Sequence, residues 1–226
     1  MLINIFNAIL IIGITYVTYK YFALRESMSP VASRTAGYIA RIGDMVDKIE
    51  GYDSSHSLEM ADLAELLGKE KGLGSEEIES LRIAAYMHDI GEVLLPREIF
   101  RSTGKLDSEK TYLMRTHPLL GELQLRNKDF PFDEVPVLIR WHHEKWDGTG
   151  YPDNLKGEEI PLAARILSLV DAVSAMKSER PYRGQGMKMN DIIKELDRLA
   201  GLQFDPELVE LYKHVLKNKA NGEEND

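Results

Sequence analysis

Residues 142–152 read His142-His143-Glu144-Lys145-Trp146-Asp147-Gly148-Thr149-Gly150-Tyr151-Pro152. No regular helix or strand requires a histidine doublet followed by this glycine-rich string, so the stretch indicates a binding site. Working outward from it, five of the chain's six histidines and two aspartates form one ordered series: His56, His88, Asp89, His117, His142, His143 and Asp171. Imidazole and carboxylate are ligands that suit iron, manganese and zinc. The series therefore predicts a metallohydrolase.

The composition is that of a globular protein. The chain has 226 residues, of which 43% are hydrophobic and 29% charged, enough for one sizeable domain plus attachments. It contains no cysteine, which excludes disulfides, iron–sulfur clusters and thiol nucleophiles. The formal net charge of −9 argues against binding of DNA or RNA polymers, because such binding needs a basic surface.

The first 19 residues carry no charge and are strongly apolar. As a helix they would be about 28 Å long, close to the thickness of a bilayer core. A cleaved signal peptide and a buried core helix are the alternatives, but no basic residue precedes the run, as a signal peptide would require. Lys20 and Arg25 follow it. We therefore expect a transmembrane anchor at residues 1–22, single-pass in the inner (cytoplasmic) membrane, with the rest of the chain in the cytoplasm.

Helical patterns follow one another along the rest of the chain, with little strand signal. The fold class is predicted to be all-α, a helical bundle. We expect helices at about 54–71, 75–91, 108–126 with a break at His117-Pro118, 133–146, after Pro161, at 190–200, and from Asp205-Pro206-Glu207 onward, with Ser75 as the N-cap of the second.

The predicted domain boundaries are a helical connector at 23–52, a catalytic domain at 53–218 and a disordered polar tail at 219–226. An apolar helix stripe of Ile39, Ile42, Met45, Val46 and Ile49 predicts that this segment is a connector or a dimer seam. A homodimer or a signalling-protein partner is the corresponding expectation for interactions.

Successive helices could deliver the histidine series to one bundle core, as in dimetal bundles. Adjacent residues on a helix point about 100° apart, so His88 and Asp89 would face neighbouring metals, with Asp89 bridging them. For any one of these positions alone, an ordinary hydrogen bond or ion pair is the simpler interpretation. His214, near Lys213 and Lys217, is interpreted as an exposed structural residue.

Residues 50–218 resemble the HD-GYP domain, a branch of the HD phosphohydrolase superfamily whose members cleave cyclic di-GMP. The resemblance rests on His88-Asp89-Ile90-Gly91, on the whole string from His142 to Pro152, on Asp171-Ala172 with Ser178-Glu179-Arg180-Pro181-Tyr182-Arg183, and on Gln203-Phe204-Asp205-Pro206. It implies an HD-type helical bundle. An HD hydrolase of another nucleotide, such as an alarmone, would not account for the complete string.

The resemblance implies two divalent metal ions, with iron or manganese preferred. One ion would be held by His56, His88, Asp89 and Asp171, and the other by Asp89, His117, His142 and His143. Such a pair activates a bridging water to attack phosphorus. The product would be the linear dinucleotide, which could be cleaved further to mononucleotide. Arg180 and Arg183 are the expected phosphate or guanine contacts, Gly148 and Gly150 would shape the pocket, and Tyr151 could stack on the substrate or donate its hydroxyl.

The sequence departs from the family pattern at two positions. The family usually carries a lysine four residues after the first histidine of the HD pair, where this chain has Glu92. An anion there would weaken stabilisation of the phosphodiester, or Glu92 could itself approach a metal, so Glu92 joins Asp89 as an expected catalytic position. Tyr52 stands where some members carry a glutamate for a third metal. The leading hypothesis is a metal-dependent phosphodiesterase that hydrolyses cyclic di-GMP or a related cyclic dinucleotide, and the alternative is a weak or inactive domain that binds nucleotide or protein partners.

Overall fold

The computed structural model describes residues 37–48, 56–99, 106–126, 130–178 and 186–223. The chain divides into two compact units, Met1–Ile39 and Ala40–Asp226, and every predicted metal-ligand residue belongs to the second. The predicted anchor at 1–22 lies outside the described residues, as does Tyr52. Where the structure is described, no helix has both the length and the apolar character needed to cross a bilayer.

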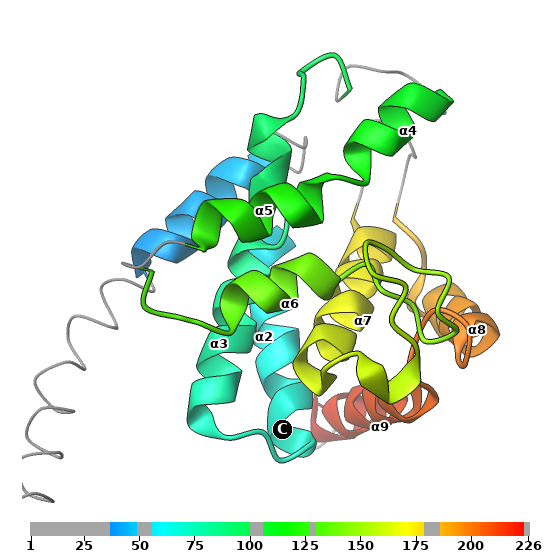
Figure 1. Cartoon of the computed structure of the whole chain (residues 1–226). Coiled ribbons are helices and arrows are strands. Elements are labelled where there is room, and N and C mark those ends of the chain that lie inside the picture. Colours follow the sequence, from blue (N-terminus) through cyan, green and yellow to red (C-terminus); the bar gives the residue numbers. More distant parts are fainter. Residues whose placement is uncertain (1–36, 49–55, 100–105, 127–129, 179–185, 224–226) are drawn as a thin grey trace, which may run out of the picture. The chain divides into compact units, whose positions relative to one another are not determined.

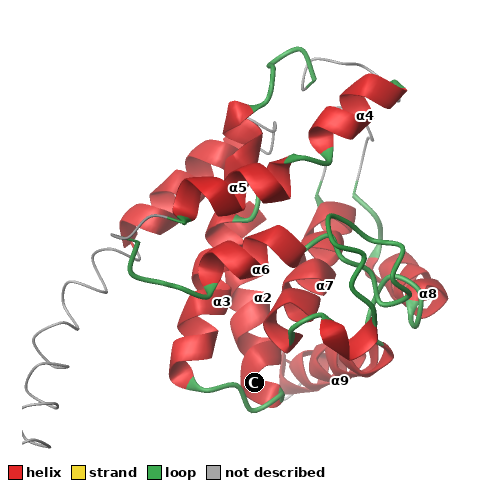
Figure 2. Cartoon of the chain, in the orientation of Figure 1, coloured by secondary structure: helices red, strands yellow, loops and turns green. Residues whose placement is uncertain are grey.

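The described residues form helices and no β-strand, with one isolated bridge between Ala200 and Phe204 (Figure 2). Beyond a helix at 37–48, the elements are α2 His56–Glu70, α3 Ser75–Met87, η1 Ile90–Leu94, α4 Ser108–Met114, α5 His117–Leu125, α6 Val135–Trp141, η2 Gly157–Glu159, α7 Leu162–Lys177, α8 Met189–Leu199 and α9 Pro206–Glu223. The predicted all-α class is confirmed.

Helices α2 and α3 form an antiparallel hairpin that packs against α7 (Figure 1). The turn between them is set by Gly72, whose φ of 78° lies in the left-handed region. The N–H of Gly72 donates to Lys69 O, and that of Leu73 donates to Gly68 O, so the last carbonyls of α2 are satisfied. A short, fixed turn of this kind makes the two helices neighbours.

Helix α7 occupies the centre of the bundle and contacts α2, α3, α6, α8 and α9. Its side chains Ile166, Leu167, Leu169 and Val170 are fully buried. Because helices surround it, α7 is apolar on more than one face, and truncating one such leucine to alanine would cost about 2–5 kcal/mol of stability. Asp171, on the same helix, is therefore carried by a deeply packed element of the fold.

Several predicted boundaries differ from the structure. Helix α6 ends at Trp141 rather than near 146, because the chain turns at His142 and the Glu144 N–H donates to Trp141 O. The N-cap of α3 is Gly74, and Ser75 is its first helical residue. The break between α4 and α5 falls at residues 115–116, immediately before the expected His117-Pro118.

The predicted tail also needs correction, because helix α9 continues to Glu223 and residues 219–223 are therefore helical. In the helix at 37–48, Ile39 and Val46 of the apolar stripe are buried, Ile42 and Met45 are 39% and 65% exposed, and Ile49 lies outside the described residues. The buried face also includes Asp47, a polar residue that the stripe did not contain. The dimer seam stays a prediction.

Candidate metal centre

The seven predicted ligand residues come together in the second unit, and six of them lie at helix ends or in the segment that follows. His56 and His117 are the first residues of α2 and α5, and His88 and His142 are the C-caps of α3 and α6. Asp89 and His143 directly follow those two C-caps, whereas Asp171 lies within α7. The sharp turns at helix ends allow neighbouring residues such as His88 and Asp89 to face one common centre.

The ligand atoms fall into two groups, each of which could hold one ion. Asp89, His117, His142 and His143 form the first, and His56, His88 and Asp171 form the second, with ligand atoms in each group within 4.8 Å of one another. Asp89 faces both groups. Its Oδ1 lies 3.0 Å from His117 Nε2 and 3.7 Å from His142 Nε2, and its Oδ2 lies 2.9 Å from His88 Nε2.

Backbone carbonyls fix the orientation of three of these rings. The Nδ1 atoms of His88, His117 and His142 lie 3.0, 2.8 and 2.7 Å from the carbonyl oxygens of the residues three positions earlier, which are Ala85, Met114 and Ile139. A carbonyl only accepts hydrogen bonds, so each Nδ1 carries the proton and each neutral ring directs the Nε2 lone pair into the centre. His56 Nδ1 is held differently, 2.7 Å from Ser174 Oγ on α7.

This arrangement places hydrogen-bond acceptors from different ligand residues next to one another. His117 Nε2 lies 3.3 Å from His142 Nε2 and 3.0 Å from the Asp89 carboxylate, although with Nδ1 protonated neither Nε2 has a hydrogen to donate. Acceptors that converge in a buried site repel one another unless a cation lies between them. The donor set of imidazole nitrogen and carboxylate oxygen fits a divalent transition metal.

Burial favours the neutral form of three imidazoles, those of His56, His142 and His143. It lowers the pKa of His56 to about 3, with a further contribution from His88. It also lowers the pKa of His142, and it holds that of His143 well below the usual value. For Asp89, burial acts to raise the pKa, but His88 and His117 outweigh it and hold the pKa well below its ordinary value. At neutral pH these groups are thus in the protonation states that bind a metal.

Glu92 lies in η1, one turn after the His88–Asp89 pair, and is only 7% exposed. Burial raises its pKa well above the ordinary value, and the charges of Asp89 and Asp171 add to that rise. Its carboxyl group therefore lies in the field of the acidic residues of the centre, although it belongs to neither ligand group. A bound cation would reverse the sign of this local field.

The loop at 142–155 is held against the centre by Glu144, which is buried. The Glu144 carboxylate accepts the backbone N–H groups of Asp153 at 2.6 Å and of Leu155 at 3.1 Å. Gly150 lies so close to Lys145 and Glu144 that an added Cβ would overlap their backbone atoms, and Gly148 has a φ of 82°. Both predicted loop glycines are thus required by the backbone path.

Tyr151 covers the outer side of the first ligand group. Its ring lies 4.9 Å from that of His143 at an interplanar angle of 31°. Arg115 lies at the α4–α5 junction, and its guanidinium carbon is 5.3 Å from the centre of the Tyr151 ring. Burial raises the pKa of Tyr151, so the phenol keeps its proton at neutral pH.

A second clamp fixes the far end of the loop. Arg140 donates two hydrogen bonds, at 2.6 and 2.7 Å, to the carboxylate of Asp153, and one at 2.6 Å to Glu122. Trp141 Nε1 donates to the same aspartate at 2.7 Å. The hydrogen bonds from Arg140 lower the pKa of Asp153 to about 2. Sequence reasoning missed this clamp, and its one available signal was the position of Arg140 and Trp141 immediately before the histidine doublet.

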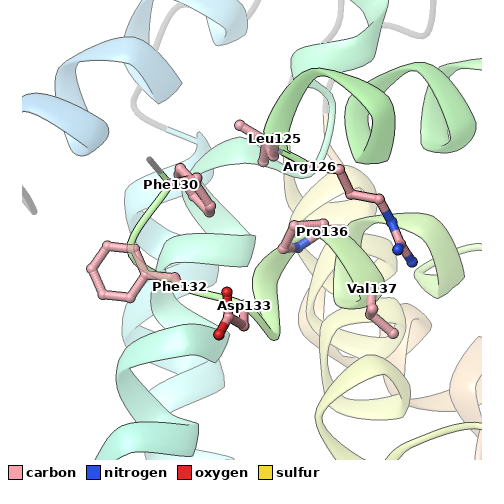
Figure 3. A pocket seen from close by; sticks show the side chains of 7 residues that line it. All are labelled: Leu125, Arg126, Phe130, Phe132, Asp133, Pro136 and Val137. Carbon is pink, nitrogen blue, oxygen red and sulfur yellow. The ribbon is translucent and has the colours of Figure 1, made fainter. Parts of the chain in front are cut away.

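Other predicted residues lie away from the described centre. Arg180 and Arg183 fall outside the described residues. His214 is exposed on α9, where its Nε2 lies 3.0 Å from Asn218 Nδ2, in agreement with its interpretation as a surface residue. A separate pocket lies between the end of α5 and the start of α6 (Figure 3). None of the residues that line it belongs to the ligand series. The lining residues are Leu125, Arg126, Phe130, Phe132, Asp133, Pro136 and Val137.

Comparison with known proteins places these observations in a family context. A family model described as an HD domain matches residues 25–208. The chain is 33% identical over 202 residues to the cyclic di-GMP phosphodiesterase response regulator RpfG of Xanthomonas campestris, covering 89% of this chain and 52% of that protein. It is 34% identical over 158 residues to 3′3′-cGAMP-specific phosphodiesterase 2 of Vibrio cholerae, covering 70% of this chain and 30% of that protein. The chain thus spans about half, or less, of the length of these relatives.

Solved structures show the same fold. A crystal structure of a cyclic GMP-AMP specific phosphodiesterase from Vibrio cholerae superposes with a TM-score of 0.61 at 21% identity, over 81% of this chain and 49% of that one. A protein of Bdellovibrio bacteriovorus described as an HDG"Y"P protein gives a TM-score of 0.61 at 19% identity, over 85% and 64% of the two chains. Identities this low establish an HD-type helical fold alone.

Proposed function

The chain belongs to the HD domain family, in its HD-GYP branch, and we propose that it is a metal-dependent phosphodiesterase that hydrolyses a cyclic dinucleotide. The observation that carries the proposal is the position of Asp89 between two groups of ligand atoms, with one carboxylate oxygen toward each. In this proposal His56, His88, Asp89 and Asp171 hold one ion, and Asp89, His117, His142 and His143 hold the other.

Two bound divalent ions would supply an activated water and neutralise charge on the phosphodiester. The protein's contribution is to hold the ligands in place. The carbonyls of Ala85, Met114 and Ile139 orient three imidazoles, and Asp89 remains ionised because its pKa is low. Tyr151, kept in place by the loop, packs its ring against that of His143. We infer that iron or manganese is the physiological metal, since these ions suit a histidine-rich, carboxylate-bridged site.

We propose cyclic di-GMP as the first substrate to test, with 3′3′-cGAMP as the second. The relative that is aligned over the larger share of this chain is named for cyclic di-GMP, and the shorter alignment is to a protein named for 3′3′-cGAMP. The test is to load anaerobically purified protein with Fe²⁺ or Mn²⁺ and to separate the products of each dinucleotide by chromatography. We expect the linear dinucleotide first. Asp89→Asn protein, assayed beside it, provides the control for contaminating activity.

The alternative function, a domain that binds a nucleotide without turnover, is favoured by one observation. Glu92 places a third acidic group beside Asp89 and Asp171, where an anionic substrate would have to approach. If metal-loaded protein binds either dinucleotide tightly and releases no product over hours, the phosphodiesterase proposal is wrong and the binding function replaces it.

We also propose that residues 1–22 anchor the protein in the cytoplasmic membrane, with the catalytic domain on the cytoplasmic side. The support is the run of 19 uncharged residues followed by Lys20 and Arg25. Fractionation of cells that express the full chain and a chain lacking residues 1–24 tests it. The full chain should sediment with membranes, and the shortened chain should stay in the supernatant and still bind metal.

A further inference from the structure

Arg115 lies at the junction of α4 and α5, two residues before the ligand His117. Its backbone is held on both sides. The Arg115 N–H donates to Thr111 O at 3.1 Å, Thr116 Oγ1 donates to Leu113 O at 2.6 Å, and His117 Nδ1 donates to Met114 O at 2.8 Å. The side chain of Arg115 therefore starts from a backbone position that is tied to the metal centre.

The guanidinium group of Arg115 lies over Tyr151, 5.3 Å from its ring centre, and Tyr151 in turn lies against His143. This stack joins the α4–α5 junction to the loop that follows the histidine doublet. A guanidinium in a cation–π contact of this kind can still donate hydrogen bonds from its N–H groups to an anion. Arg115 thus places a set of donors next to the first ligand group.

The charge of Arg115 is not paired with an acidic side chain in the described part of the fold. Arg140 and Arg165 each pair with a carboxylate at 2.6 Å, whereas Arg115 is exposed and forms no ion pair with any acidic side chain that the structure describes. Its surroundings are acidic. Burial raises the pKa of Tyr151 most; the charges of Asp89, Asp171 and Glu92 add to that rise, and the charge of Arg115 opposes it. An unpaired cation next to an acidic centre has the chemistry of an anion contact.

The substrate class of the proposed function supplies such an anion. A cyclic dinucleotide carries two phosphodiester groups, and only one of them can lie at the metal ions while it is cleaved. We propose that the guanidinium of Arg115 binds the second phosphodiester, the one that is not being cleaved, and so makes the site specific for cyclic dinucleotides over simple phosphodiesters. This inference rests on the proposed function, and it goes beyond it by naming a specificity-determining residue outside the ligand series.

The test compares two substrates in four proteins: the full-length wild type, Arg115→Ala, Arg115→Lys and the control Arg198→Ala. Arg198 is exposed on α8 and pairs with Glu195, away from the ligand series. The substrates are cyclic di-GMP, with two phosphodiesters, and bis(p-nitrophenyl) phosphate, with one. For Arg115→Ala we expect KM for cyclic di-GMP to rise roughly tenfold to a hundredfold, the usual effect of losing a charge-assisted contact. Its kcat for both substrates and its KM for the single phosphodiester should stay within about twofold of wild type.

The lysine variant and the control sharpen the result. Arg115→Lys keeps the charge but loses the planar fork, so it should recover part of the lost KM. Arg198→Ala should match wild type. An unchanged KM for cyclic di-GMP in Arg115→Ala would overturn the inference and leave the proposed function standing. Equal losses on both substrates, or a lower metal content, would overturn it in favour of a structural role for the Arg115–Tyr151 contact.

Equilibrium binding separates failure of this inference from failure of the proposed function. If the metal-loaded wild type turns over neither substrate, the phosphodiesterase proposal fails, and binding of cyclic di-GMP to wild type and Arg115→Ala is compared instead. At least tenfold weaker binding by the variant would support the contact in a binding domain. Equal affinity, or no binding by either protein, would overturn it.

Discussion

Replacing Asp89 by asparagine should remove both metal ions, whereas replacing Asp171 by asparagine should remove one. Asp89 directs Oδ2 toward His88 at 2.9 Å and Oδ1 toward His117 at 3.0 Å, so its carboxylate is positioned to serve both ligand groups. Asp171 lies 3.8 Å from His56 and 3.9 Å from His88, within a single group. Asparagine keeps the shape of each side chain and removes its charge, so the fold should be preserved. Loss of a partner that only orients a metal ligand typically weakens metal binding about 10–100-fold, and loss of a direct, shared ligand should exceed that.

The size of the effect can be read from thermal stability. At a free metal concentration of 100 times Kd, each occupied site stabilises the folded state by about 2.7 kcal/mol, which for a domain of this size raises Tm by about 5–11 °C. Wild type should therefore show two such increments, Asp171→Asn one and Asp89→Asn none, with elemental analysis giving matching stoichiometries. His214→Ala, a histidine removed from the surface of α9, should behave as wild type. A full metal complement in Asp89→Asn, or equal losses in the two aspartate variants, would refute the shared-ligand arrangement.

Three further predictions follow from individual side chains. If Glu92 only repels the phosphodiester, Glu92→Lys should increase turnover or substrate affinity by roughly tenfold or more. If the Glu92 carboxylate assists metal binding, the same variant should contain less metal. The same measurements on Glu92→Gln separate the effect of charge from that of shape. Glu144→Gln should destabilise the protein by about 1–3 kcal/mol in urea unfolding, because its amide turns a donor toward the backbone N–H groups of residues 153 and 155. Glu134→Gln, on the surface, is the control. Equal stability of the two variants would contradict the role of Glu144 in holding the loop. Burial lowers the pKa of His56 to about 3 in the folded, metal-free protein. In the unfolded chain the same histidine takes up a proton near its ordinary pKa of about 6.5. The free energy of unfolding should therefore fall as pH drops from about 6.5 toward 3. His56→Asn should show a shallower dependence, and identical slopes would show that His56 does not contribute.

The helices and the ligand series could be predicted from the sequence because both depend on local patterns. Apolar spacing located both ends of α2 and α8, and the start of α7, to within about two residues, and the ligand residue types stand out in a chain with six histidines. Even the ring orientations follow a local rule, since His88, His117 and His142 each use the carbonyl three residues earlier. A histidine at a helix end can reach that carbonyl whatever the rest of the fold does.

The remaining features depend on contacts between distant parts of the chain, which spacing does not encode. Ser174 and His56 are 118 positions apart, and no pattern in either segment indicates their hydrogen bond. The stack of Arg115 on Tyr151 joins two loops that are each irregular. The length of α6 was overestimated for a related reason: its helical pattern continues past Trp141, but Glu144 is used to hold the following loop instead of a further helical turn.

The placement of the ligands at helix ends has a consequence for how the centre can be influenced. A ligand on the face of a long helix moves only with the whole helix, whereas a ligand at an end also moves when the neighbouring junction changes. Asp47, in the helix at 37–48, accepts hydrogen bonds at 3.0 Å from the backbone N–H of Ser57 and at 2.9 Å from its hydroxyl group. Ser57 directly follows His56, so one pair of hydrogen bonds connects that helix to the first turn of α2 and to its ligand. Asp171 lies within the buried helix α7 and has no such link to a helix junction. A displacement of Asp47 would therefore move His56 relative to Asp171, which belongs to the same ligand group.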